Sequence, residues 1–166
     1  MLRICSMLFA AVLIAIAWFI VATTGQLGDT VATHFGSGFL ANGWMQRSEY
    51  LASSLTFSTV LPLIVAGIVG GLPRILPRYV NMPHRDYWLA PERSAATLET
   101  IAVRALLLGT LLSVFMGGVH WLILQANAMV PPRLPAQLFW TMLIAFLTAF
   151  AFWIWAFWSH FRDVPN

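Results

Sequence analysis

The side chains best suited to metal binding or proton transfer in this sequence are four histidines and six carboxylates. His34 and His120 can meet on one side of a membrane near Asp29 or Glu49, and two histidines with a carboxylate can bind zinc with an open position. The spacing contains neither a paired-histidine helix motif nor a cysteine pair. We therefore favour satisfied polar contacts for these histidines, and predict no metal and no cofactor.

A second set of acid-base groups consists of His84, Asp86 and Tyr87, which would suit lipid chemistry beside a membrane surface. The sequence has no nucleophile elbow, no phosphate-binding glycine loop and no identifiable activated nucleophile. A non-enzymatic protein is therefore favoured over a metal-dependent or lipid-modifying enzyme.

The elements that position these residues are predicted to be membrane helices. The chain is 60% hydrophobic and 9% charged, whereas a soluble domain carries about 25% charged residues. Because lipid offers the backbone no hydrogen bonds, and these stretches lack polar-apolar alternation, helices are favoured over barrel strands. We predict an all-α integral membrane protein, a single domain over residues 1–166 folded as a four-transmembrane-helix bundle. Four uncharged stretches are each long enough to cross about 30 Å of hydrocarbon: 4–24, 51–72, 105–126 and 136–158.

The arginines predict the orientation of these helices. Four spans place both termini and the loop 73–104 on one side, which carries seven of the nine arginines; Arg47 and Arg133 lie on the other. The positive-inside rule then puts both termini in the cytoplasm. The basic charge indicates orientation and anionic lipid headgroups, and we predict membrane lipids rather than nucleic acid as partners.

Small residues recur at four-residue spacing in two of the spans, where they allow helix backbones to approach closely. We predict that they pack inside the bundle, with a dimer face as the alternative. They are Ala105, Gly109, Ser113 and Gly117 in the third span, and Gly67 and Gly71 in the second.

Pro62 interrupts the second span. Proline lacks an N–H and clashes with the preceding turn, so we expect a kink near Ser58, with the hydroxyls of Ser58 and Thr59 available to the freed carbonyl.

The loop 26–50, predicted to lie outside the cytoplasm, is rich in glycine and has turn signals at Asn42 and Gly43. We expect an ordered, hairpin-like excursion that folds back against the bundle, followed by a helix that starts near Ser48 without a full capping box. This loop supplies most of a candidate ligand site, which comprises Asp29, His34, Phe35, Trp44, Glu49 and His120.

The loop 73–104 is the most polar part of the chain. Pro91 is suited to the first turn of a helix that runs into the third span, with Glu92 in that turn. We expect ion pairs and headgroup contacts to make this loop a docking surface. Its candidate residues are Arg74, Arg78, His84, Arg85, Asp86, Tyr87, Trp88, Glu92 and Arg93.

The motifs Thr33-His34-Phe35 and Asn42-Gly43-Trp44-Met45, set between two hydrophobic helices, resemble the bacterial membrane domain of unknown function (1648 type) found in Sdp-type toxin-immunity proteins. The resemblance covers about 13–61. The segment 81–93 is similar to one in a small four-helix subgroup of that family, although Gly28, Ala32 and Asn42 depart from the family pattern.

The resemblance implies a multi-pass protein of the bacterial inner membrane and protection against a membrane-active toxin, coupled to capture of a cytoplasmic regulator. Our leading hypothesis is accordingly a sensing or immunity-like binding protein. The alternative is an accessory subunit of a larger membrane-protein complex.

Overall fold

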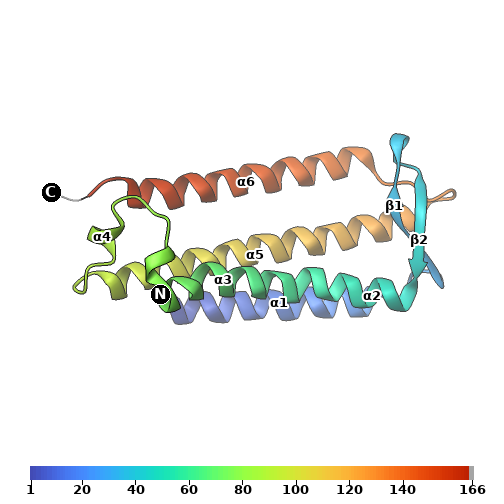
Figure 1. Cartoon of the computed structure of the whole chain (residues 1–166). Helices are drawn as coiled ribbons and strands as arrows, with labels where there is room; N and C mark the ends of the chain where they lie inside the picture. The colour runs from blue at the N-terminus through green and yellow to red at the C-terminus, as the bar shows by residue number, and fades with distance from the viewer. Residues whose placement is uncertain (165–166) are drawn as a thin grey trace.

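Four long apolar helices dominate the computed structural model, which describes residues 1–164 (Figure 1). Each is long and apolar enough to cross a membrane, so the four predicted spans are confirmed as helices. Their ends extend beyond the uncharged stretches, because a helix can continue past the hydrocarbon core. The long helical segments are α1 (Leu2–Thr24), Arg47–Ile75, α5 (Ser94–Asn127) and α6 (Ala136–Arg162).

The two ends of the molecule differ in structure. At one end the antiparallel strands β1 (Thr30–Phe35) and β2 (Ala41–Gln46) form a hairpin, here called the hairpin end. At the other lie the N-terminus and the short helix α4 (Arg85–Trp88), here called the α4 end (Figure 1). The all-α prediction is therefore correct for the spans, and the hairpin-like excursion predicted in the loop 26–50 is present as two paired strands.

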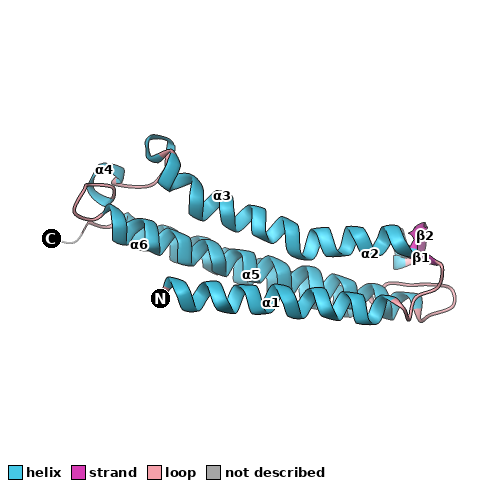
Figure 2. Ribbon diagram, turned by 90° about the horizontal axis from the view of Figure 1, so that it is seen from below, coloured by secondary structure: helices cyan, strands magenta, loops and turns pink. Residues whose placement is uncertain are grey.

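The second helical segment is continuous but distorted. It consists of α2 (Arg47–Leu55), a π-helical turn (Thr56–Val60) and α3 (Leu61–Ile75). Pro62 has no N–H for the carbonyl of Ser58, four residues earlier. The distortion therefore falls where the sequence predicts it, and Figure 2 shows the resulting bend between α2 and α3.

The freed carbonyl finds its partner on another helix. Ser113 Oγ of α5 donates to Ser58 O at 2.7 Å, and both residues are buried. Thr59 Oγ1 instead donates to Leu55 O at 2.6 Å. The expectation that Ser58 and Thr59 satisfy the freed carbonyl locally is thus corrected, because the close approach of α5 brings in a hydroxyl.

Helix α5 is central, since its main contacts are with α1 and α3. The predicted small-residue strip of α5, from Ala105 through Gly109 and Ser113 to Gly117, is buried in these contacts. A Cβ added to Gly109 would lie 2.9 Å from the Phe9 ring, and one added to Gly117 would lie 2.6 Å from Ile16 Cδ1. The strip therefore packs inside the chain.

The partner glycine on α3 is not the one that the spacing suggested. A Cβ added to Gly70 would lie 3.0 Å from Ala105 Cβ and 3.2 Å from Ala102 Cα, whereas Gly67 and Gly71 face open space. Gly70 lies about 60° from Gly67 and about 100° from Gly71 around the helix axis, and α3 presents the Gly70 side to α5.

Helix α6 packs mainly against α5. Its single buried residue is Phe161, near the end of the helix, within the described part of the chain. The architecture is thus three closely packed helical segments with α6 attached at the side of α5, rather than an even four-helix bundle.

Two predicted helix starts shift. Helix α2 begins at Arg47 with Gln46 as its N-cap, and Gln46 and Glu49 form a capping box in which Gln46 N donates to Glu49 Oε2 at 3.3 Å. Helix α5 begins at Ser94, because the N–H groups of Arg93 and Ser94 both bond Ala90 O and close a separate turn over 91–93. Pro91 and Glu92 therefore precede the helix.

Candidate functional site

The hairpin turn does not fall at Asn42 and Gly43, which lie within β2. It is formed by 36–40, where Gly38 and Phe39 have φ of 79° and 63°. Gly43 is instead needed for strand pairing, because a Cβ there would lie 2.9 Å from the His34 Cβ across the ladder. Glycine is favoured both in tight turns and where two strands approach closely, so the sequence alone does not show which of these roles Gly43 has.

The hairpin is fixed to the helices, as the sequence predicts. Asn127, at the end of α5, accepts a hydrogen bond from Ala32 N at 2.8 Å and donates one to Ala32 O at 3.0 Å. The turn and the start of β2 bond the α5–α6 connection, because Leu134 N donates to Phe39 O at 2.9 Å and Ala41 N donates to Pro132 O at 3.1 Å.

Apolar contacts also hold the hairpin against the helices. Val31 of β1 is fully buried in a cluster with Leu27, Tyr50 and Ile123, and Phe35 and Met45 pack against it. The hairpin is therefore a preformed cap on the helices.

Beneath this cap lies a polar cluster around His120, which is 2% exposed. His120 Nε2 lies 2.8 Å from Thr23 Oγ1 of α1, and His120 Nδ1 lies 2.7 Å from Tyr50 Oη of α2. The imidazole also stacks on the Tyr50 ring and meets the Phe19 ring edge-on. Both ring nitrogens are thus in hydrogen bonds, which is the satisfied contact that the sequence analysis favoured.

A small cavity of about 150 Å³ adjoins the cluster. Its polar lining includes Ser53, Ser54 and Tyr50, and Met116 lies on its α5 side. Because polar groups inside a helical membrane protein commonly join helices by hydrogen bonds, the cluster serves as a three-helix junction of α1, α2 and α5.

The other predicted ligand-site residues do not meet His120. Asp29 pairs with Arg47 at 3.2 Å, His34 Nδ1 contacts Asn42 Oδ1 on the hairpin, and Glu49 caps α2. Trp44 is 55% exposed on the hairpin. Among residues 1–164, no group of three histidine, cysteine or carboxylate side chains is arranged to hold a metal.

Sequence reasoning missed Thr23, Tyr50 and Asn127. All three are polar residues close to the ends of predicted spans, where hydrogen bonds between helices are common. That position is the signal that could have identified them, but the partners of each lie far away in the sequence.

At the α4 end, the polar loop is folded over the ends of α5 and α6. Trp88 Nε1 donates to Phe161 O at 3.1 Å, and Thr97 Oγ1 donates to Trp88 O at 2.8 Å. Met82, Ile101 and Phe161 form a buried cluster beneath it. An apolar core and Trp88 therefore hold the loop.

The arginines of this loop mainly bond backbone carbonyls and aromatic rings. Arg74 Nη1 donates to Gly70 O at 2.7 Å, and Arg85 Nη1 donates to Arg78 O at 2.9 Å. Arg93 Nε donates to Tyr87 O at 3.0 Å, and its guanidinium lies 3.9 Å from the centre of the Tyr87 ring.

The predicted ion pairing is weak by comparison. Asp86 is 3.6 Å from Arg85 Nε, but its side chain is 97% exposed, and exposed pairs of this kind contribute about 0–1 kcal/mol. Glu99 lies near the N-terminal amine at 3.8 Å. His84 has a φ of 49° and precedes α4 as its N-cap. The loop is thus ordered by packing and carbonyl contacts more than by its carboxylates.

In comparisons with known proteins, no family model matches the sequence, and no curated protein or solved structure matches it. The class that the structure defines is a mostly helical protein with four helices that could cross a membrane and one small hairpin, which suggests a multi-pass membrane protein.

Proposed function

We propose that this chain is a non-enzymatic binding protein of the bacterial inner membrane, which senses or neutralises an envelope ligand with its hairpin end. The proposed topology has both termini and α4 in the cytoplasm. It is supported by the arginines, since Arg47 starts α2 directly after β2 and Arg133 bridges to the hairpin at Leu40, whereas the other seven belong to the α4 end and the helices near it.

The observation that carries the proposal is the fixed hairpin with an exposed aromatic side chain. Asn127 and the α5–α6 connection hold the hairpin through four hydrogen bonds. Trp44 is 55% exposed, and Leu40 is 46% exposed. A preformed surface loses little conformational entropy on binding, and tryptophan is among the residues that most often dominate binding energy.

The immunity-like element of the proposal rests on the motifs Thr33-His34-Phe35 and Asn42-Gly43-Trp44-Met45. In the structure, His34 and Asn42 contact each other across the hairpin, and Trp44 is 55% exposed and is not part of the buried cluster that holds Val31. The two motifs thus supply the His34–Asn42 contact inside the hairpin and the exposed aromatic side chain of Trp44. A recognition element would need both.

The test is a protection assay in a null strain challenged with a panel of membrane-active peptides. Cells complemented with the wild-type chain should survive at least one peptide that kills the null strain. Trp44→Ala should lose this protection while its membrane level stays unchanged. Trp155→Ala is the matched control, because Trp155 is similarly exposed at 63% but belongs to α6, nearer the α4 end. Equal protection by the Trp44 and Trp155 variants would show that the hairpin does not carry the protection.

The alternative, an accessory subunit of a larger membrane-protein complex, is favoured by one observation. Helix α6 carries large exposed apolar residues, including Ile144, Phe152 and Trp155, on a helix that packs mainly against α5. Purification in mild detergent separates the two hypotheses. Stoichiometric co-purification with one larger assembly, lost on Phe152→Ala and retained on Trp44→Ala, would favour the accessory subunit.

A further inference from the structure

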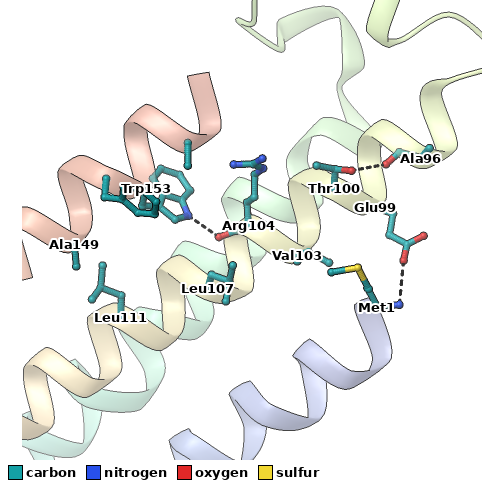
Figure 3. Close-up of a pocket in the computed structure, with 12 residues that line it drawn as sticks. Met1, Ala96, Glu99, Thr100, Val103, Arg104, Leu107, Leu111, Ala149 and Trp153 are labelled. Atoms are coloured by element: carbon teal, nitrogen blue, oxygen red, sulfur yellow. Dashed lines mark hydrogen bonds and ion pairs between the residues drawn. The ribbon is translucent and has the colours of Figure 1, made fainter. Parts of the chain in front are cut away.

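Two cavities of about 680 Å³ and 340 Å³ follow one another between α5 and α6 and share Leu111 as a lining residue. Together they are called the groove here. The groove begins near Glu99 at the α4 end and extends to Gly118 and Met142. Figure 3 shows its wider part, with α5 in the middle, α6 on one side and the start of α1 on the other.

The two ends of this groove differ in charge. Arg104 lies at the wider end, and from Leu107 onward the α5 side of the groove is apolar. Trp153 Nε1 donates to the backbone carbonyl of Arg104 at 2.9 Å, which joins α6 to α5 and leaves the guanidinium available. Figure 3 shows Arg104 between Trp153 and Thr100.

The charge of Arg104 is not neutralised by the described chain. Its guanidinium lies 5.9 Å from the centre of the Phe157 ring, but no carboxylate of residues 1–164 lies within ion-pair distance. Glu99, the acid at the same end, instead contacts Met1 N at 3.8 Å and Leu2 N at 3.4 Å. A guanidinium near the hydrocarbon region without a counter-ion calls for an anionic partner.

The distance from Arg104 to the far end of the groove indicates what that partner is. Arg104 and Gly118 are separated by about 21 Å along α5, at about 1.5 Å per residue. Half of a bilayer measures about 20–22 Å from the outside of its headgroups to its midplane. A lipid with its phosphate at Arg104 would therefore reach Gly118 with its acyl chain. A transmembrane helix from another chain would need about 30 Å of apolar surface and would cover Arg104 with apolar side chains.

We propose that this groove is a binding site for one anionic phospholipid from the leaflet at the α4 end. Its phosphate accepts charge-assisted hydrogen bonds from the Arg104 guanidinium, and one acyl chain lies along α5 from Leu107 to Gly118, against Trp153 and Phe146 of α6. The bound lipid fills the space that the one-sided packing of α6 leaves, and so fixes α6 on α5. This proposal does not depend on the function proposed for the hairpin.

The experiment is native mass spectrometry of the full chain in mild detergent, with equal amounts of a phosphatidylglycerol and a phosphatidylcholine of the same acyl chains. The wild type should retain mainly phosphatidylglycerol. Arg104→Gln should lower retained phosphatidylglycerol about tenfold, as expected for a lost charge-assisted hydrogen bond, and change phosphatidylcholine little. Arg133→Gln, an exposed arginine at the hairpin end, is the matched control and should change neither.

A second variant addresses the apolar part of the groove without changing charge. Ala149→Trp, on the α6 side of the groove, should reduce retention of both lipids because its ring occupies the space of the acyl chain. If Arg104→Gln fails to fold, Ala149→Trp still tests whether an acyl chain occupies the groove. Equal retention of the two lipids by the wild type, or unchanged phosphatidylglycerol in Ala149→Trp, would overturn the proposal.

A second copy of the chain is the competing occupant. Replacing Cys5, the single cysteine, with serine and introducing Leu107→Cys places a thiol in the groove. In nanodiscs this thiol should remain unpaired and become labelled by a photoreactive phosphatidylglycerol acyl chain. An interchain disulfide in most of the protein, with no lipid label, would assign the groove to a dimer and reject the lipid site.

Discussion

Ser113 of α5 donates a hydrogen bond to the carbonyl of Ser58, which Pro62 deprives of its helical partner. The bond lies inside the membrane-length part of both helices, where no water is available to replace it. Because Pro62 leaves the Ser58 carbonyl without its helical donor, the third span has to supply a hydrogen-bond donor at Ser113.

This relationship predicts a non-additive pair of substitutions. Ser113→Ala should leave the Ser58 carbonyl unpaired and destabilise the fold by about 1–2 kcal/mol. In a Pro62→Ala background the restored N–H can bond Ser58 O, so the same substitution should cost much less. Thermal unfolding of all four variants in one detergent measures the coupling. The same loss of stability in both backgrounds would mean that Ser113 does not serve the freed carbonyl.

The buried glycines of α5 predict a position-dependent effect of bulk. Gly109→Leu should strongly lower the melting temperature in detergent, because its side chain would meet the Phe9 ring and the Pro62 carbonyl. Gly71→Leu is the matched control, since a Cβ there meets open space and the change in helix propensity is the same. Leu107→Ala, at an exposed residue, should also change little. Equal melting temperatures for Gly109→Leu and Gly71→Leu would show that the close contact between the helices does not lie at Gly109.

The topology is tested by reporter fusions. Fusions after Arg85 and Arg162 should be active with a cytoplasmic reporter, and fusions after Gly38 and Pro132 with an exported phosphatase. The expectation follows from the seven arginines of the α4 side against two of the hairpin side. Phosphatase activity from the Arg85 fusion would invert the proposed orientation, and with it the membrane face assigned to the hairpin.

The order of the loop at the α4 end should depend on Trp88 rather than on Asp86. Trp88→Ala removes a hydrogen bond to Phe161 O and contacts with the Met82 cluster, so amide exchange across 80–90 should accelerate in nanodiscs. Asp86→Asn should leave exchange unchanged, because that carboxylate is 97% exposed. Faster exchange in Asp86→Asn than in Trp88→Ala would restore the ion-pair account of this loop.

The hairpin should likewise depend on Asn127. Asn127→Leu removes both bonds to Ala32 while retaining a side chain of similar size, so exchange at Val31 and Ala32 should accelerate. Asn42→Ala, at an exposed contact on the same hairpin, should have a smaller and more local effect. Protection that survives Asn127→Leu would assign the position of the hairpin to the Val31 cluster alone.

The sequence by itself determined the four helices and the place of the distortion. Long uncharged stretches require helices wherever the backbone lies in lipid, and a missing N–H at Pro62 disturbs the helix whatever surrounds it. These are local consequences of residue type. The burial of Gly109 and Gly117 was also predictable, because small residues at four-residue spacing mark a face that admits another backbone.

The tertiary structure decided which residues meet. Gly70 rather than Gly67 or Gly71 contacts α5, because the rotation of α3 is set by its packing partners. His120 meets Thr23 and Tyr50, which lie 97 and 70 residues away in the sequence, while the carboxylates proposed as its companions cap a helix or pair with Arg47. A polar side chain near the end of a span bonds whichever group the packing of the helices brings nearest. That choice depends on helix rotation and on the side placement of α6, which residue type and spacing do not specify.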